Sequence, residues 1–384
     1  MVEEVAEEVA EGLGGKLDFL AHFAALADPR QSVKVLYPLE EVLLLTLCAV
    51  LCGADGWVSV ALFGKQKLAF LRRFRPFANG TPSHDQLGLI FGALDADGFQ
   101  SCFIAWTQGL ARAVEGVVAI DGKTARRSFD RAGGKGAVHM VSAWSSTQQL
   151  VLGARAVAEK SNEITAIPEL LDLLAIKGAI VTIDAMGCQK KIAEKIVDKG
   201  ADYVFGLKGN QGTLRDDVEL LFTEQSASGF KDVAVSRAAS CDADHGRIET
   251  REVFAVDDID WLKQRHDWNG LRSVVMVVSR RETAKGEGQE RRFYISSLPA
   301  DARALAAAIR AHWGVENGLH WVLDVHFRDD DCRIRKKNAP ANFSAVKRAA
   351  LNALRKAPGR NSLKSKRLIA AWDEDYLART LDAI

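Results

Sequence analysis

The sequence predicts a mixed α/β fold, because the hydrophobic pattern changes once the chain passes its first hundred residues. Residues 17–110 carry apolar side chains at helical spacing, as in Phe19, Phe23 and Leu26. From Val117 onward, short apolar runs typical of buried strands alternate with helical segments. A three-stranded meander followed by helix–strand units with parallel pairing is the order of an RNase H-like sheet. We therefore expect an RNase H-like core preceded by an all-α N-terminal domain.

The all-α domain is expected to cover residues 1–115, with its acidic residues 1–15 frayed. Its helices are predicted at 39–53, 57–73 and 97–114. Another helix should begin after Ser83, whose hydroxyl is suited to capping the first backbone N–H groups.

The second domain is expected to cover residues 116–384. Its core strands are predicted at 117–120, 139–146, 150–158, 179–183 and 201–206, and its core helices at 168–175 and 188–199. Residues 212–298 form a mixed segment that we interpret as a β-rich insertion, with a helix at 214–222 and strands at 233–236, 248–256, 271–279 and 292–297. Residues 299–384 are expected to be helical and basic, since 328–367 hold 13 Lys and Arg against three Asp.

The composition is that of an ordinary globular protein of 384 residues. Its net charge is only +1, so the protein has no overall positive electrostatic field that would attract nucleic acid. The six cysteines are scattered, which argues against a zinc site and a disulfide framework and fits a reducing, cytoplasmic location. The longest apolar run, 42–52, is too short to span a bilayer, and the acidic N-terminus is unlike a signal peptide.

Two aspartates follow the strands expected at the centre of the sheet. Asp121 comes after the run 117–120, and Asp184 comes after the run 179–183. In a parallel pair these carboxylates would lie at the same strand ends, close enough to share a divalent ion. Either aspartate taken alone could instead be a turn or cap residue.

A third carboxylate is expected from the segment 312–325, which reads as a helix. His312, Glu316, His320 and Asp324 fall near one face of that helix. Three clustered carboxylates repel one another unless a cation is present. Two Mg²⁺ ions held in this way can activate a water or a 3′-hydroxyl and stabilise the leaving oxygen in phosphoryl transfer.

Several motifs in order resemble the H-repeat-associated family of insertion-sequence DDE transposases, over nearly the whole chain. They are IDGKT at 120–124, VSAW at 141–144, NEITAIP at 162–168, TIDAMGCQ at 182–189, ADY at 201–203, LKGNQ at 207–211, HGRIETR at 245–251 and the segment 312–324. The resemblance implies a DDE triad on an RNase H-like fold, with Asp121, Asp184 and Glu316 as the catalytic and metal-binding residues. It also implies Mg²⁺ as the cofactor, with Mn²⁺ able to substitute. Asp324 stays open as an alternative third carboxylate.

The broader cut-and-paste relatives carry a Tyr-x2-Arg-x3-Glu-x6-Lys pattern that this chain lacks. The matching positions hold Ile309, His312 and Leu323. We therefore expect His312, Arg310 or His320 to take over the contact with phosphate.

Further DNA contacts are expected from basic residues around the motifs, namely Lys123, Arg126, Arg127, Lys208, His245, Arg247, Arg333, Arg335 and Lys336. Lys123, Arg126 and Arg127 could instead lie in a solvated loop. The alternating charges of 245–251 could instead form a ladder of salt bridges. Arg72, Arg73 and Arg75 suggest that the N-terminal domain recognises DNA ends. Packing is an equally open role for that domain.

The sequence thus predicts a nucleoid-associated DNA transposase that cuts and joins strands at the ends of its own element. Its expected partners are double-stranded DNA and a second copy of the chain on paired ends. Two alternatives remain: a domesticated relative that binds DNA without cutting it, and an RNase H-like nuclease of structured DNA that lacks strand transfer.

Overall fold

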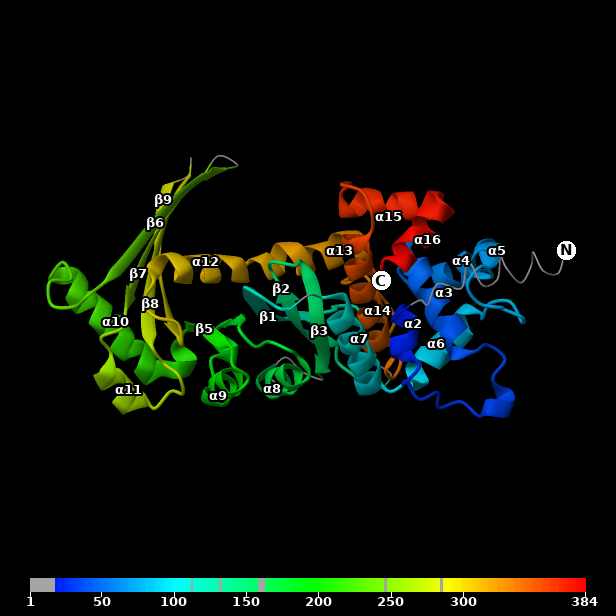
Figure 1. Ribbon diagram of the computed structural model, residues 1–384, viewed down its shortest axis with the longest axis horizontal. Helices are drawn as coiled ribbons and strands as arrows, with labels where there is room; N and C mark the ends of the chain where they lie inside the picture. The colour runs from blue at the N-terminus through cyan, green and yellow to red at the C-terminus, as the bar shows by residue number, and fades with distance from the viewer. Residues whose placement is uncertain (1–17, 112, 131–132, 158–162, 245–246, 284–285) are drawn as a thin grey trace.

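The computed structural model describes residues 18–111, 113–130, 133–157, 163–244, 247–283 and 286–384. The segment expected to be frayed, 1–15, and His245 lie outside these ranges. The molecule is elongated, with a β-rich end, a central sheet and a helical end that holds the N-terminal helices (Figure 1).

One mixed sheet of nine strands runs through the described chain in the order β3-β2-β1-β4-β5-β9-β8-β7-β6. The strands are β1 (Val117–Thr124), β2 (His139–Ser145), β3 (Leu150–Val157), β4 (Ile180–Ile183), β5 (Asp202–Leu207), β6 (Ser236–Asp244), β7 (Arg247–Val256), β8 (Ser273–Thr283) and β9 (Gly286–Ser296). The first three strands form the expected antiparallel meander, and β4 and β5 add to β1 in parallel. The mixed α/β class is therefore confirmed.

The segment 212–298 extends this sheet instead of forming a separate one. Strand β9 pairs antiparallel with β5, and β8, β7 and β6 follow outward. Strands β8 and β9 are longer than expected, because their polar outer halves carry no apolar run that would mark them in the sequence. Strand β7 lies where it was expected, whereas the strand expected at 233–236 is wrong, since β6 begins only at Ser236. The helices α10 (Gly212–Ala227) and α11 (Asp260–His266) accompany this end of the molecule (Figure 1).

Helices cover both faces of the central sheet. On one face lie α8 (Glu163–Leu173) and α9 (Lys190–Asp198), while α12 (Ala302–His312) crosses β1, β4 and β5 on the other (Figure 1). Helix α8 begins five residues earlier than expected, so Pro168 lies inside the helix and not in its first turn. The apolar face of α8, with Ile167, Leu170 and Leu171 buried, holds the helix in place despite the proline.

The N-terminal helices pack around a long, almost wholly buried helix from the other end of the chain. They are α2 (Asp18–Phe23), α3 (Leu39–Leu51), α4 (Trp57–Gln66), α5 (Leu68–Leu71), α6 (His84–Ala93) and α7 (Ala96–Leu110). Helix α14 (Ala339–Lys356) contacts α3, α6 and α7, and it also contacts β3. The helices α15 (Leu363–Trp372) and α16 (Glu374–Asp382) close this end. The boundary at residue 115 stays a prediction.

Two local expectations in the N-terminal helices had different outcomes. Ser83 caps α6 as expected, because its Oγ accepts a hydrogen bond from the Gln86 backbone N–H. The single helix expected at 57–73 is wrong, since the chain breaks at Lys67 between α4 and α5.

The helix expected at 312–325 is also interrupted. Helix α12 ends at His312, a π-helical turn covers Glu316–His320, and α13 follows at Trp321–Phe327. Gly318 lies inside the π turn against the indole of Trp144, where an added Cβ would come within 2.7 Å of Cζ2. The Arg355 guanidinium donates a hydrogen bond to the Gly318 carbonyl at 2.8 Å. The glycine therefore allows a close approach that fixes the turn beside β2.

Within the described ranges, no single helix is long and apolar enough to cross a membrane; α6 and α7 meet that criterion only as a pair bent by 89°.

Candidate active site

Asp121 and Asp184 lie side by side on neighbouring strands. Strand β1 continues to Thr124 instead of ending at 120 as expected, so Asp121 lies within β1, whereas Asp184 follows β4 directly. Ile120 of β1 pairs with Ile183 of β4 in parallel register, so Asp121 and Asp184 each come directly after a paired residue. The Asp184 carboxylate also accepts hydrogen bonds from the backbone N–H groups of Met186 and Gly187, at 3.0 and 3.4 Å. Asp184 is thus a cap residue as well as a strand-end carboxylate, and the cap fixes its side chain.

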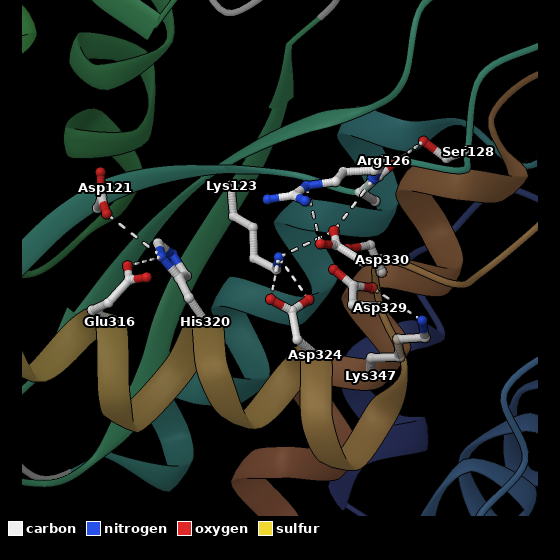
Figure 2. Close-up of polar contacts among 12 residues, drawn as sticks. Asp121, Lys123, Arg126, Ser128, Glu316, His320, Asp324, Asp329, Asp330 and Lys347 are labelled. Carbon is white, nitrogen blue, oxygen red and sulfur yellow. Dashed lines mark hydrogen bonds and ion pairs between the residues drawn. The ribbon is translucent and has the colours of Figure 1, made fainter.

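Glu316 and His320 reach Asp121 from the π turn (Figure 2). His320 Nδ1 lies 3.1 Å from Glu316 Oε2 and 3.5 Å from Asp121 Oδ2. One ligand atom from each of the three residues lies within 4.8 Å of the others, which makes this the group of described residues best placed to hold a metal ion. Asp184 is outside that group and lines the same cavity.

Burial and crowding perturb the titration of this cluster. Burial raises the pKa of Asp121 to about 7, with smaller contributions from the carboxylates of Asp184, Glu163 and Glu316, although the hydrogen bond from the Gly122 N–H acts in the opposite direction. Burial lowers the pKa of His320 to about 4, although its hydrogen bond to Glu316 acts in the opposite direction. Without a cation, the site therefore resists ionisation of Asp121, as expected for carboxylates that share a positive ion.

A cavity of about 430 Å³ opens beside the carboxylates. Asp121, Asp184 and Glu316 line it from the sheet and the π turn. Its other walls carry basic and aromatic side chains from the end of β5, α10, β9 and the end of α12, namely Lys208, Arg215, Arg291, Arg292, His312 and Trp313. Glu290 lines the same wall and pairs with Arg292 at 2.8 Å. The Arg292 guanidinium lies over the Trp313 ring at 5.3 Å. The cavity thus combines a carboxylate floor with cationic walls suited to phosphate.

His312 has a defined place in that cavity. Its Nδ1 lies 3.0 Å from Thr182 Oγ1, and burial lowers its pKa despite the nearby Asp184 carboxylate. The imidazole is therefore kept neutral and is held by β4.

Asp324, the alternative third carboxylate, is engaged elsewhere. Lys123 Nζ lies 2.7 Å from an Asp324 carboxylate oxygen and 3.3 Å from Asp330, and only 9% of the Lys123 side chain is exposed (Figure 2). Glu316 contacts the Asp121 cluster, whereas Asp324 neutralises a buried lysine one helical turn beyond His320. The geometry therefore favours Glu316 over Asp324.

The remaining residues predicted to contact DNA are spread over the molecule, and several are paired with acids. Arg126 and Arg127 lie 3.2 Å from Asp330 and Asp331, and Arg310 lies 2.8 Å from Asp242.

The other predicted contacts have no acidic partner among the pairs above. Arg335 donates to the Arg127 carbonyl and lies over the Phe129 ring. Lys208, Arg333 and Lys336 have exposed side chains. Arg247 begins β7, and His245 lies outside the described residues.

The fold divides the basic C-terminal part into surface and core. Lys347 and Arg348 of α14 are 1% and 0% exposed, and Lys347 Nζ lies 3.0 Å from Asp329. Lys366 is also buried and donates to backbone carbonyls. The local charge excess therefore overstates the basic surface.

Sequence reasoning missed several groups around the site. His139 Nε2 and Glu163 Oε1 form a buried pair at 2.5 Å next to Gly122, below Asp121. Arg291 and Arg292 reach the cavity from β9, far along the chain. Glu163 lies in the motif at 162–168 and Trp313 in the segment 312–324, so the sequence contained a signal for both. Arg291 and Arg292 come close to the site only through the pairing of β9 with β5, which the sequence does not reveal.

Two aspartates on neighbouring strands and a glutamate from a helix around one cavity are the arrangement of the DDE class of proteins. The sequence pattern described as "Transposase DDE domain" matches residues 112–353, and the pattern "DDE_Tnp_1-associated" matches residues 20–107. The chain belongs to the H-repeat-associated family of DDE transposases.

Similar proteins of Escherichia coli span nearly the whole chain. The protein named "Putative transposase YncI" from strain O157:H7 is 42% identical over 94% of each chain. The "H repeat-associated putative transposase YhhI" of strain K12 is 42% identical over 94% of this chain and 97% of its own. Among solved structures, a piggyBac transposase synaptic complex with hairpin DNA matches at a TM-score of 0.43 and 10% identity, over 97% of this chain and 79% of that chain.

Proposed function

We propose that this chain is a metal-dependent DNA transposase that cleaves DNA at the ends of an insertion sequence and joins those ends to a target. The observation that carries the proposal is the meeting of three carboxylates at one cavity: Asp121 and Asp184 from parallel neighbours, and Glu316 from the π turn. The strand order, a meander followed by two parallel strands, supports an RNase H-like core.

The donor set fits a divalent cation. Asp121 is partly buried, whereas Asp184 and Glu316 have exposed side chains. The pKa of Asp121 is raised to about 7, and a positive ion would relieve the repulsion among these carboxylates. Asp121, Asp184 and Glu316 would hold the ions, with Mg²⁺ as the expected metal and Mn²⁺ as a substitute. Bound there, such ions supply Lewis-acid stabilisation of the attacking and leaving oxygens in phosphoryl transfer.

The chain's own residues would place the DNA. The cavity walls carry Lys208, Arg291 and Arg292, which are suited to the phosphates next to the cleaved bond. His312, kept neutral and held by Thr182, is suited to donating or accepting a hydrogen bond beside Asp184. We further propose that two copies act together on paired ends.

The test compares Glu316→Gln with a control on the same helical segment, Asp324→Asn. We expect Asp121→Asn, Asp184→Asn and Glu316→Gln each to lower cleavage of element-end DNA by more than about a hundredfold. The reason is that losing a direct metal ligand costs more activity than losing a group that only orients a ligand. Binding of the same DNA on a gel should persist. Asp324→Asn should retain cleavage.

Three outcomes would decide against the proposal. Cleavage that survives Asp184→Asn would remove the two-ion chemistry. Mg²⁺-dependent cutting of branched DNA without joined products would favour the nuclease alternative. A protein that binds element ends but never cuts them would favour the binding-only relative.

A further inference from the structure

We propose that His320 is itself a metal ligand, so that one ion of this site is bound by Asp121, Glu316 and the His320 imidazole. This inference rests on the proposed function, because it concerns the same ion. The carboxylates alone would make an all-oxygen site. The imidazole adds a nitrogen ligand, which changes the preference of the site among metal ions.

The separations between the three groups suit one ion. His320 Nδ1 lies 3.1 Å from Glu316 Oε2 and 3.5 Å from Asp121 Oδ2 (Figure 2). Neighbouring ligands around an octahedral ion with bonds of about 2.1 Å lie about 3 Å apart. Two carboxylates with a neutral imidazole also carry the charge that balances a divalent cation.

The imidazole is held firmly in this position. His320 is 6% exposed, and the preceding Leu319 is fully buried. The π turn that carries Glu316 and His320 is fixed by the Gly318 contact with Trp144 and by the hydrogen bond from Arg355. Metal-binding groups gain affinity from such preorganisation, because little freedom remains to be lost on binding.

In the absence of an ion, the Glu316 carboxylate favours a proton on His320 Nδ1, because Oε2 can only accept a hydrogen bond. The second ring nitrogen, Nε2, is buried and has no hydrogen-bond partner among the described residues. The tautomer of a histidine is normally set by the hydrogen bond of the nitrogen that does not bind metal. Since no hydrogen bond holds Nε2 in one state, an ion that displaces the Nδ1 contact with Glu316 would leave the proton on Nε2 and the lone pair of Nδ1 directed to the metal.

The competing role is positioning. In that case Nδ1–H only donates to Glu316 and orients its carboxylate. Loss of His320 would weaken metal binding in either case, so affinity alone does not distinguish them. The two roles differ in whether a nitrogen touches the ion and in the preference among metals, because imidazole favours first-row transition ions over Mg²⁺.

The experiment titrates the full chain with Mn²⁺ in the absence of DNA and records pulsed EPR spectra of the bound ion. We expect ¹⁴N couplings in the unsubstituted protein that disappear in His320→Ala and persist in His312→Ala and in the control His326→Ala. His320→Ala should weaken Mn²⁺ binding at least about tenfold. His320→Asp should retain binding and lower the Mn²⁺-to-Mg²⁺ affinity ratio by about tenfold or more, since it restores an all-oxygen site.

The outcomes separate this inference from the proposed function. Mn²⁺ binding that depends on Asp121 and Glu316 but shows no ¹⁴N coupling overturns the inference and leaves the proposed function standing. Coupling that survives His320→Ala also overturns it. Absence of Mn²⁺ binding, or binding indifferent to Asp121→Ala, overturns both.

Discussion

At the scale of single residues, a buried ion pair next to the site stabilises the fold. Asp329 and Lys347 are 2% and 1% exposed and lie 3.0 Å apart, directly behind the Lys123–Asp330 contact (Figure 2). Burial opposes ionisation of Asp329, but Lys347 and Arg348 outweigh it and hold the pKa of Asp329 below its usual value. The ion pair is therefore intact at neutral pH.

Removing one member of this pair should destabilise the fold. We expect Asp329→Asn to lower the free energy of unfolding by about 3–5 kcal/mol, because Lys347 is left buried without its counter-charge. Urea unfolding at neutral pH measures this difference. The double variant Asp329→Leu with Lys347→Met is the control and should recover much of the loss.

The same pair predicts a pH dependence. A carboxyl with a lowered folded-state pKa contributes stability above its unfolded value, about pH 4, and loses it as pH falls through the lowered pKa. The gap between the unsubstituted protein and Asp329→Asn should therefore shrink in acid. A gap that stays constant below about pH 3 would contradict this account.

At the scale of elements, the segment after α13 presents an unneutralised basic cluster, defined as Arg333, Lys336 and Lys337. The three preceding acids are used elsewhere: Asp329 pairs with Lys347, Asp330 with Lys123 and Arg126, and Asp331 with Arg127 and Arg328. In the described chain none of these acids pairs with the basic cluster. Among the described residues, the three aspartates therefore do not neutralise the basic cluster.

This cluster should bind DNA phosphates without reading sequence. Replacing Arg333, Lys336 and Lys337 by Ala should lower the slope of log affinity against log salt by about two to three units, at roughly 0.9 per contact. Affinity for random and element-end DNA should fall alike. The measurement is fluorescence anisotropy across a salt series.

A matched control replaces three exposed cations from other parts of the molecule, Lys177, Lys231 and Arg303. The control should leave the slope nearly unchanged. An equal loss in both variants would mean that the effect follows net charge alone.

At the scale of the whole molecule, α14 connects the N-terminal helices to the sheet. The Asn342 amide donates to the Phe91 and Leu94 carbonyls of the N-terminal half. Asn352 exchanges two hydrogen bonds of 2.9 Å with the Val151 backbone in β3. Both asparagines are fully buried, so each bond is made away from water.

We expect the two halves to unfold together for this reason. Asn342→Ala or Asn352→Ala should cost about 1–3 kcal/mol each, since buried backbone groups lose their partners. Hydrogen exchange in α3 and in β3 should report the same loss for either variant. A loss confined to the half that contacts the substituted residue would show that the halves unfold separately.

Much of the local structure could be predicted because it depends on neighbours in sequence. Apolar periodicity located the core strands and placed Asp184 directly after β4, but it missed the polar second half of β1, which contains Asp121. Ser83 was recognised as a cap because a cap needs only the next three residues. Most of β6 and the outer halves of β8 and β9 were missed, since polar strands are held by pairing and not by burial.

What the sequence determined by itself was therefore the family, the core strands and the two carboxylates on neighbouring strands, Asp121 and Asp184. The tertiary structure decided which neighbours those groups have. It places Glu316 and His320 next to Asp121, pairs Asp324 with Lys123, and buries Lys347 and Arg348 inside the protein. The physical reason is that charge pairing and desolvation depend on contacts between segments far apart in the chain, which local periodicity does not encode.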